Sequence, residues 1–441
     1  MRPARPPRIP FSLLFLLLST LLLLTPVSAS RPRPHILSKR NPTYSPLTSR
    51  STLLNLTTLT DLDKTFDWND KESLLSKVLI PREVGSDNLK TLQRMFEDKF
   101  SSLGWEVEKD TFTTSTPLGP QTFTNLIFTH SPLSTRQLVL SAHLDSKYFP
   151  PSSPSHGKFI GATDSAVPCV VLFDLAESLT SWLDARKERI RQEGGEQGRE
   201  DGEQGEGLRI VFFDGEEAFQ DWSGIDSIYG AKHLVERWEK PDSLPKGFRE
   251  LLRERGTRGK VWPKNELERT SHLVLLDLLG AKGPIIRNFY KNTGWFFDEF
   301  RESEQKLGQM GLLWPSVGGG GEEYDKVSNE AGRKEKSFFV DRRLPQSWIG
   351  TIEDDHLPFL KKGVPVVHLI SVPFPKVWHT IGDDASALDL DTIKAWALIV
   401  RLTVAEYLGL DPELNSAIGG GSSNTKRGGG EAGAGKCKDE L

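Results

Sequence analysis

Two adjacent glutamates, Glu216 and Glu217, follow a short apolar run in a pattern that could support catalysis. The run Ile210–Phe213 has the β-branched and aromatic residues of a buried strand, and the turn pair Asp214-Gly215 ends it. Neighbouring side chains in a turn cannot point the same way, so one glutamate could bind a metal while the other carries a proton. Taken alone, two acids after a strand are more typical of a solvated turn.

The same pattern recurs along the chain, because three other strand-like runs end in an acid or a histidine. In an open α/β sheet, ligands bind at the carboxyl ends of the strands. Residues that follow these runs are therefore expected to lie near Glu216 and Glu217. The runs are Gln137–Ala142, which ends at His143 and Asp145, Leu273–Leu276, which ends at Asp277, and Val364–Ile370, which leads to His379.

Asp164 stands just ahead of Val170–Leu183, whose apolar periodicity predicts a helix. An isolated aspartate in this place is most often a helix cap. Together with Glu217 and His379 it would instead complete a set of three protein ligands with one position left open. That is the pattern of a catalytic zinc site.

The chain between 61 and 415 is long enough for one large α/β domain. Residues 30–60 are expected to be a disordered linker, and two Gly-rich charged inserts, 194–207 and 317–337, are expected to be loops. Apolar spacing predicts helices at Phe66–Leu79, Asp87–Leu103 and Leu390–Leu408, and alternation predicts strands at Trp105–Phe112 and Thr122–Thr129.

The two ends of the chain carry targeting signals and are left out of the fold. Met1–Ala29 has a basic start, a leucine-rich stretch and small residues at its end, which predicts a signal peptide. Residues 416–441 form a Gly-rich tail that ends in Lys-Asp-Glu-Leu, the signal that the KDEL receptor reads. We expect a protein of the endoplasmic reticulum lumen or early secretory pathway, with membrane contact only if the first segment stays uncleaved. Lumenal entry would allow glycosylation of Asn55, in the sequon Asn55-Leu56-Thr57.

Composition excludes some classes of protein. The formal net charge is −4 with both signs interspersed, so nothing indicates binding to nucleic acid. Only two cysteines are present, Cys169 and Cys437, and the second lies in the Gly-rich tail. No stabilising disulfide is expected, so the fold must depend on its apolar core.

These residues resemble a known family, the glutaminyl-peptide cyclotransferases or glutaminyl cyclases, which share their fold with the zinc aminopeptidases. The resemblance extends from about Thr65 to Leu410 and is most specific in the block that contains FPKVWHT. It implies an open, mostly parallel twisted sheet flanked by helices. The matching segments are HLDSKYF at 143–149, GATDSAVPC at 161–169, IVFFDGEEAFQDWSGIDSIYGAKH at 210–233, LLDLLGA at 275–281 and IEDDHLPFLKKGVPVVHLISVPFPKVWHTIGDD at 352–384.

The resemblance implies roles for the acids and the histidine already singled out. Asp164, Glu217 and His379 would bind one zinc ion per chain. Glu216 would be the general acid and base. The aminopeptidase relatives bind a second metal at the positions of His143 and Asp145, whereas the cyclases are described with one zinc.

The resemblance also implies a substrate pocket above a pair of acids. Asp277 and Asp354 would form a hydrogen-bonded pair at the bottom of the site. Two carboxylates in one buried site share a proton, so one pKa is raised and the pair gains a donor. The walls of the pocket would be Trp222, Ile352, Phe374 and Trp378.

One departure from the family concerns its disulfide. Members that have one pair the cysteine matching Cys169 with a cysteine directly before the HxD motif, and here that position is Ala142. Cys169 is therefore expected to be free, which bears on stability and not on chemistry.

Several other polar residues are expected to be structural. Asp355 would lie in a surface turn that caps a helix at Leu357–Lys362. The histidines inside apolar runs are expected to be packing or surface residues, because none of them ends a run. They are His233, His272 and His368.

Three functions are consistent with this sequence. The first is a cyclase that converts the N-terminal glutamine of peptides or proteins to pyroglutamate with release of ammonia. The second is an aminopeptidase of the same fold, with two zinc ions and a water nucleophile. The third is a KDEL-retained peptide-binding protein without activity, which would have no need of Glu216. The resemblance of Trp222 and the FPKVWH block to the cyclases favours the first.

Overall fold

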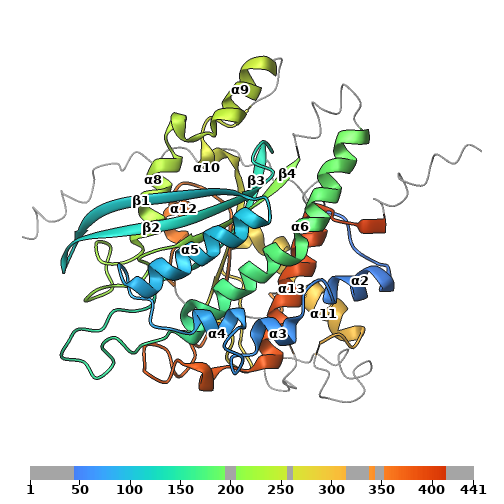
Figure 1. The fold of residues 1–441 in the computed structure, drawn as a ribbon. Helices are drawn as coiled ribbons and strands as arrows, with labels where there is room; N and C mark the ends of the chain where they lie inside the picture. The colour runs from blue at the N-terminus through green and yellow to red at the C-terminus, as the bar shows by residue number, and fades with distance from the viewer. Residues whose placement is uncertain (1–43, 194–204, 256–261, 314–336, 343–351, 414–441) are drawn as a thin grey trace, which may run out of the picture. The chain divides into compact units, whose positions relative to one another are not determined.

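Six strands form one mixed sheet in the order β1-β2-β4-β3-β5-β6 (Figure 1). The computed structural model describes residues 44–193, 205–255, 262–313, 337–342 and 352–413. The signal segment, the KDEL tail, residues 194–204 of the first insert and most of the second insert lie outside these ranges. The strands are β1 (Glu106–Thr116), β2 (Gly119–His130), β3 (Arg136–His143), β4 (Glu206–Phe213), β5 (Thr270–Asp277) and β6 (Val366–Ile370).

The strands that lead to the predicted site residues are parallel. β3 pairs in parallel with β4 and β5, and β5 pairs in parallel with β6, whereas the β1-β2 hairpin joins β4 in the antiparallel sense. Every residue of β4, β5 and β6 is buried. Parallel strands of this kind need cover on both faces. The predicted α/β class with an open, mostly parallel sheet is confirmed.

Helices cover both faces of the sheet, and β3 shows how its side chains alternate between them. Leu138 and Leu140 pack into the cluster that includes α5, α6 and α13, whereas Val139 packs into the cluster of α8 and α12. The helices are α2 (Arg50–Thr57), α3 (Leu62–Phe66), α4 (Leu74–Val78), α5 (Asp87–Ser102), α6 (Val167–Glu193), α8 (Tyr229–Trp238), α9 (Lys246–Arg255), α10 (Glu266–Arg269), α11 (Gly294–Gln309), α12 (His356–Lys361) and α13 (Leu390–Leu408).

The helix α6 is long and apolar enough to cross a membrane by length and composition. In the fold, however, 89% of its most apolar window is buried inside the protein. It is therefore a core helix, which packs between α13 and the sheet. A short π-helical turn, η1 (Ala162–Ala166), leads into it and carries Asp164.

The prediction of one helix at Phe66–Leu79 was wrong. In this segment only Phe66, the last residue of α3, and α4 are helical, and turns lie between them. Asp67 accepts a hydrogen bond from the Asn69 N–H, and Asp70 accepts one from the Glu72 N–H. Side chains that bond backbone N–H groups two residues ahead favour turns over helix.

The prediction of a disordered linker over 30–60 was wrong for the part that the structure describes. Residues 50–57 form α2, which buries Leu53 and Leu56. The Leu47 N–H also donates to Glu406 Oε1 at 2.8 Å. Two leucines three residues apart give one face of a helix, a signal that the low overall periodicity of 30–60 hid.

The predicted first insert ends earlier than expected. Glu206 and Gly207, placed in the loop 194–207, begin β4 and are buried. Their composition resembles the insert, but their register opposite Arg136 and Gln137 of β3 makes them strand residues.

Candidate metal centre and catalytic site

The predicted residues meet at the carboxyl end of the parallel strands. His143 and Asp277 are the last residues of β3 and β5. Glu216 and Glu217 follow β4, and His379 lies in the loop after β6. The sheet topology therefore brings together residues that lie far apart in the sequence.

Asp164, Glu217 and His379 form a cluster that could hold a metal ion. Their ligand atoms all lie within 4.8 Å of one another. His379 Nε2 is 3.2 Å from Glu217 Oε1 and 3.4 Å from Asp164 Oδ2. Both of these carboxylate oxygens are buried without a hydrogen-bond partner among the described residues. Buried carboxylates require compensation by a cation, so this donor set fits a divalent metal such as zinc.

His379 is held in an unusual conformation beside an indole. Its φ is +54°, which costs energy for a residue other than glycine and is found most often at functional sites. Its ring stacks on Trp378, with the centroids 3.8 Å apart. Burial opposes protonation, but Asp164 and Glu217 raise the pKa of His379 to about 9. A metal bound there must displace a proton, because only neutral imidazole is a ligand.

The HxD motif orients the catalytic turn. The carboxylate oxygens of Asp145 accept the N–H groups of Glu216 and Glu217, both at 3.2 Å. His143 Nε2 lies 2.9 Å from Asp164 Oδ1, and its Nδ1 lies 3.0 Å from the Asp145 carbonyl oxygen. These residues thus position Glu216, Glu217 and Asp164, and His143 also forms a group of potential ligands with Asp164 and Asp277.

Glu216 is buried, and its environment disfavours the charged carboxylate. Burial raises its pKa well above the usual range, His143 opposes this, and the neighbouring Glu217 adds to it. A carboxyl group whose pKa is raised holds a proton more readily and can both take and give one. Glu216 has the properties of a proton carrier, while Glu217 faces the metal cluster.

Asp277 and Asp354 lie in the same buried region but bond different partners. Asp277 accepts a short hydrogen bond from Ser165 Oγ, and Asp354 Oδ2 lies 2.8 Å from His368 Nε2. Burial and the charge of Asp277 raise the pKa of Asp354 well above the usual range. The expected raised pKa of one acid is present. The hydrogen bonds of the two acids are to Ser165, His368 and the Asp355 N–H, whereas the family resemblance implied that the acids bond each other.

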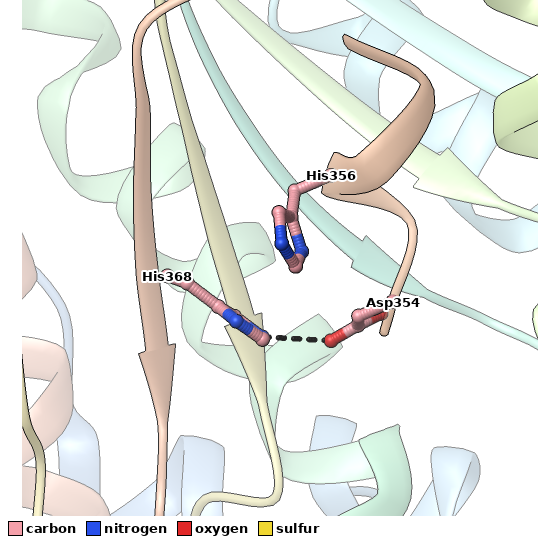
Figure 2. Close-up of side chains that lie close together, drawn as sticks. All are labelled: Asp354, His356 and His368. Carbon is pink, nitrogen blue, oxygen red and sulfur yellow. Dashed lines mark hydrogen bonds and ion pairs between the residues drawn. The ribbon is translucent and has the colours of Figure 1, made fainter. Parts of the chain in front are cut away.

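Figure 2 shows His368 and Asp354 joined by this bond, with the ring of His356 above them. The two imidazole rings are 4.4 Å apart, and His356 Nε2 lies 2.5 Å from the Tyr290 hydroxyl. Burial lowers the pKa of both histidines, to about 4 for His368. Asp354, His356 and His368 form a further cluster of potential metal ligands, so His368 is more than the packing residue that the sequence predicted.

Asp355 differs from the prediction of a surface turn residue. It precedes α12, but its side chain does not cap the helix and is fully buried. Burial and the neighbouring Asp354 raise the pKa of Asp355 well above the usual range. The acidic run suggested solvent exposure, whereas the fold buries Asp355 near Asp354, His143, Asp145 and Asp277. The other two histidines pack as predicted, since His272 is buried and His233 stacks on Phe112.

The four predicted pocket residues lie on three loops: Trp222 follows β4, Ile352 precedes α12, and Phe374 and Trp378 follow β6. Trp222 is 38% exposed, and its Nε1 donates to Glu353 Oε2 at 3.2 Å. The rings of Phe374 and Trp378 meet edge to face at 5.0 Å. Ile352 and Phe374 are half-buried, and Trp378 is exposed. Indoles left this accessible can contact a ligand.

Comparison with known proteins separates the functions that share this geometry. Residues 125–404 match the model of peptidase family M28. A glutaminyl-peptide cyclotransferase of Drosophila melanogaster is 38% identical over 335 residues, which are 76% of this chain and 79% of that protein. The chain belongs to the glutaminyl-peptide cyclotransferase family.

Solved structures agree with this assignment. The crystal structure of Macrostomum lignano glutaminyl cyclase matches with a TM-score of 0.64 and 32% identity, and covers 85% of this chain and 98% of that one. A leucine aminopeptidase precursor from Bacteroides thetaiotaomicron matches with a TM-score of 0.52 and 18% identity, covering 80% and 97%. The second likeness shows only that the cyclotransferase fold is also an aminopeptidase fold.

Cys169 of this cyclotransferase family member is buried and free, as expected. Its Sγ lies 3.0 Å from the His143 carbonyl oxygen.

Lys147 is a site residue that sequence reasoning missed, since its Nζ lies 3.2 Å from Glu217 Oε2. Its place four residues after His143, inside the matching segment HLDSKYF, is the only signal that could have indicated it.

Arg82 is a second residue that the sequence did not indicate, and it holds the loops of the site. Its guanidinium is fully buried and donates to the carbonyl oxygens of Leu144, Ile160 and Gly161, as well as to two in its own segment. Leu144 adjoins the HxD motif, and Gly161 precedes η1. Arg82 therefore ties together the two loops that carry Asp145 and Asp164.

We expect Arg82→Met to lower the free energy of unfolding by about 3–5 kcal/mol, because it leaves several buried carbonyl groups without a donor. Urea unfolding would measure this. Arg94→Met is a matched control, since Arg94 is exposed and bonds only locally within α5. Equal stability of the Arg82 variant and the control would contradict the role given to Arg82.

The neutral state of His368 predicts a loss of stability in acid. Its pKa is about 4 in the fold and about 6.5 in the unfolded chain, so the unfolded state binds more protons between these values. The free energy of unfolding should fall as pH drops from about 6.5 toward 4. His368→Gln should lose less stability than the wild type between about pH 7.5 and pH 5. His156→Gln, at an exposed position, should behave as the wild type, and an unchanged acid loss in the His368 variant would contradict the explanation.

Proposed function

We propose that this cyclotransferase converts N-terminal glutamine of peptides and proteins to pyroglutamate by means of one zinc ion and Glu216. Asp164, Glu217 and His379 would hold the ion. The observation that carries the proposal is the turn after β4, where Glu217 faces the metal cluster and the buried Glu216 lies next to it. A ligand and a proton carrier are thus fixed by the same two backbone bonds to Asp145.

The reaction needs a proton to move between two nitrogens. The α-amine attacks the side-chain amide carbon, a new C–N bond closes the ring, and the bond to the amide nitrogen breaks to release ammonia. A zinc ion at the site would supply a Lewis acid for the amide carbonyl oxygen. Glu216 takes the proton that the amine loses and gives it to the departing nitrogen. Its raised pKa suits both transfers.

The other buried groups would orient the substrate. Burial and the charge of Asp277 raise the pKa of Asp354, which favours its protonated form, whose hydroxyl would donate while Asp277 accepts. His368 fixes the orientation of Asp354 through its 2.8 Å bond. The nucleophile is tethered to its electrophile, so the enzyme mainly has to hold the folded conformer and exclude water. The aromatic side chains of Trp222, Phe374 and Trp378 suit that task.

An aminopeptidase is the second candidate, because the chain is a member of family M28 and His143, Asp164 and Asp277 also form a cluster of potential ligands. In the experiment, the purified protein is incubated with a glutamine peptide and with a leucine peptide, and the masses of the products are measured. Loss of ammonia from the first peptide only, with one molar equivalent of zinc, supports the cyclase. Release of free leucine, with two equivalents, would favour the aminopeptidase.

We also propose that the protein resides in the lumen of the early secretory pathway and is retrieved by the KDEL receptor. The signal-like residues 1–29 and the C-terminal Lys438–Leu441 support this. Asn55 is exposed on α2, where an oligosaccharide can be accommodated. Deletion of Lys438–Leu441 should cause secretion, and Asn55→Gln should remove a glycosidase-sensitive mass shift. Retention of the deleted form would contradict the role of the tail.

A further inference from the structure

The large apolar side chains that remain exposed are concentrated around the site. Six are exposed among the described residues, and four of them lie on the two loops that carry the proposed metal ligands Glu217 and His379. The remaining two are Leu54 on α2 and Leu118 in the β1-β2 turn. The four are Trp222 (38% exposed), Ile225 (85%), Trp378 (40%) and Ile381 (51%). Scattered apolar residues on a surface need no explanation, but a concentration of them marks a binding surface.

Ile225 stands at the tip of a rigid turn. Ser223 and Asp226 form an isolated bridge at the base of the turn, so Gly224 and Ile225 form its tip. The carboxylate of Asp226 also accepts the N–H groups of residues 219–221 and the Tyr229 hydroxyl. Glycine and polar residues are usual at such tips. This isoleucine is almost wholly exposed, and no packing partner in the described part of the chain explains its place at the tip.

Ile381 occupies an equivalent place on the second loop. The Asp383 N–H donates to the Thr380 carbonyl oxygen at 3.0 Å, so Ile381 and Gly382 are the central residues of a β-turn. Ile381 is three residues after Trp378, as Ile225 is three residues after Trp222. Each isoleucine thus lies on the same loop as a tryptophan of the proposed pocket.

We propose that Ile225 and Ile381 bind the second and third side chains of the peptide substrate and favour apolar residues there. The inference rests on the proposed function, in which Trp222 and Trp378 are among the walls of the pocket that holds the glutamine. A peptide whose first residue is held there must leave the site across the surrounding surface. The exposed isoleucines lie on the same two loops as Trp222 and Trp378, so apolar side chains that follow the glutamine would be partly removed from water against them.

The test compares two peptides that differ only after the glutamine, Gln-Leu-Leu-amide and Gln-Ser-Ser-amide. The wild type should prefer the leucine peptide roughly five- to tenfold in kcat/KM. The double variant Ile225→Ser, Ile381→Ser should reduce that ratio to within about twofold of one. Leu118→Ser is the matched control, with a similarly exposed leucine on a turn outside the two loops, and should keep the wild-type ratio. Unchanged thermal unfolding of the double variant would show that its fold is intact.

Each other outcome has a defined meaning. Equal turnover of both peptides by the wild type, or an unchanged ratio in the double variant, would overturn this inference and leave the proposed function standing. Cyclisation of neither peptide by the wild type would overturn both. Reduced binding of the double variant to phosphatidylcholine vesicles, with an unchanged peptide ratio, would assign the isoleucines to a membrane surface and contradict the proposal.

Discussion

Glu216→Gln is expected to lower kcat for pyroglutamate formation by about two to four orders of magnitude, the usual contribution of a general acid-base group. Glutamine has nearly the same shape but cannot take up the proton of the attacking amine. The backbone bonds from this turn to Asp145 remain in the variant, so the cluster of Glu217 should keep its metal. The rate is measured by release of ammonia, and the metal by elemental analysis.

A control for this variant exists on β4, the strand that leads to the turn of Glu216. Glu206 is also buried and lies at the opposite end of β4, away from the site. Glu206→Gln should retain most of the wild-type kcat. If the Glu216 variant kept more than about a tenth of the activity, or if it lost the metal, the role of Glu216 as proton carrier would be wrong.

His379→Ala is expected to abolish activity by removing the metal. Loss of a group that only supports a ligand costs about 10–100-fold in metal affinity, so loss of a ligand itself should cost at least as much.

The same histidine predicts a pH effect in the wild type, because its pKa of about 9 makes protons compete with the metal. Metal affinity should therefore fall as pH decreases below about 9.

His356→Gln tests which cluster of potential ligands holds the metal. Asp354, His356 and His368 share no residue with the cluster of Asp164, Glu217 and His379. If the metal lies between Asp164, Glu217 and His379, the His356 variant should retain it after dialysis while the His379 variant does not. Metal loss in the His356 variant, with retention in His379→Ala, would place the ion beside Asp354 and would require a different mechanism.

The site residues that the sequence predicted well have local signals. Glu216, Glu217, His143 and Asp277 each follow an apolar run, and the run specifies both the strand and the edge at which it ends. Parallel pairing then brings these ends together, as the α/β pattern predicts. The general location of the site and the class of the fold could therefore be read from order and spacing alone.

The residues that the sequence missed depend on contacts between distant segments. Arg82 looks like any surface arginine, yet it is fully buried because carbonyl groups from residues 144, 160 and 161 surround it. His368 sits within a strand with no unusual neighbour in sequence, and its bond to Asp354 forms only when β6 packs beside the loop before α12. Asp355 was expected in solvent because its neighbours in sequence do not show the contacts that bury it. Packing between segments, and not local propensity, decides burial.

Anomalous X-ray diffraction at the zinc absorption edge, on crystals grown with zinc, tests the central claim most directly. The account predicts one strong peak per chain, located between Asp164 Oδ2, Glu217 Oε1 and His379 Nε2. A sole peak beside Asp354, His356 and His368, or a second peak of equal height at His143 and Asp145, would contradict it.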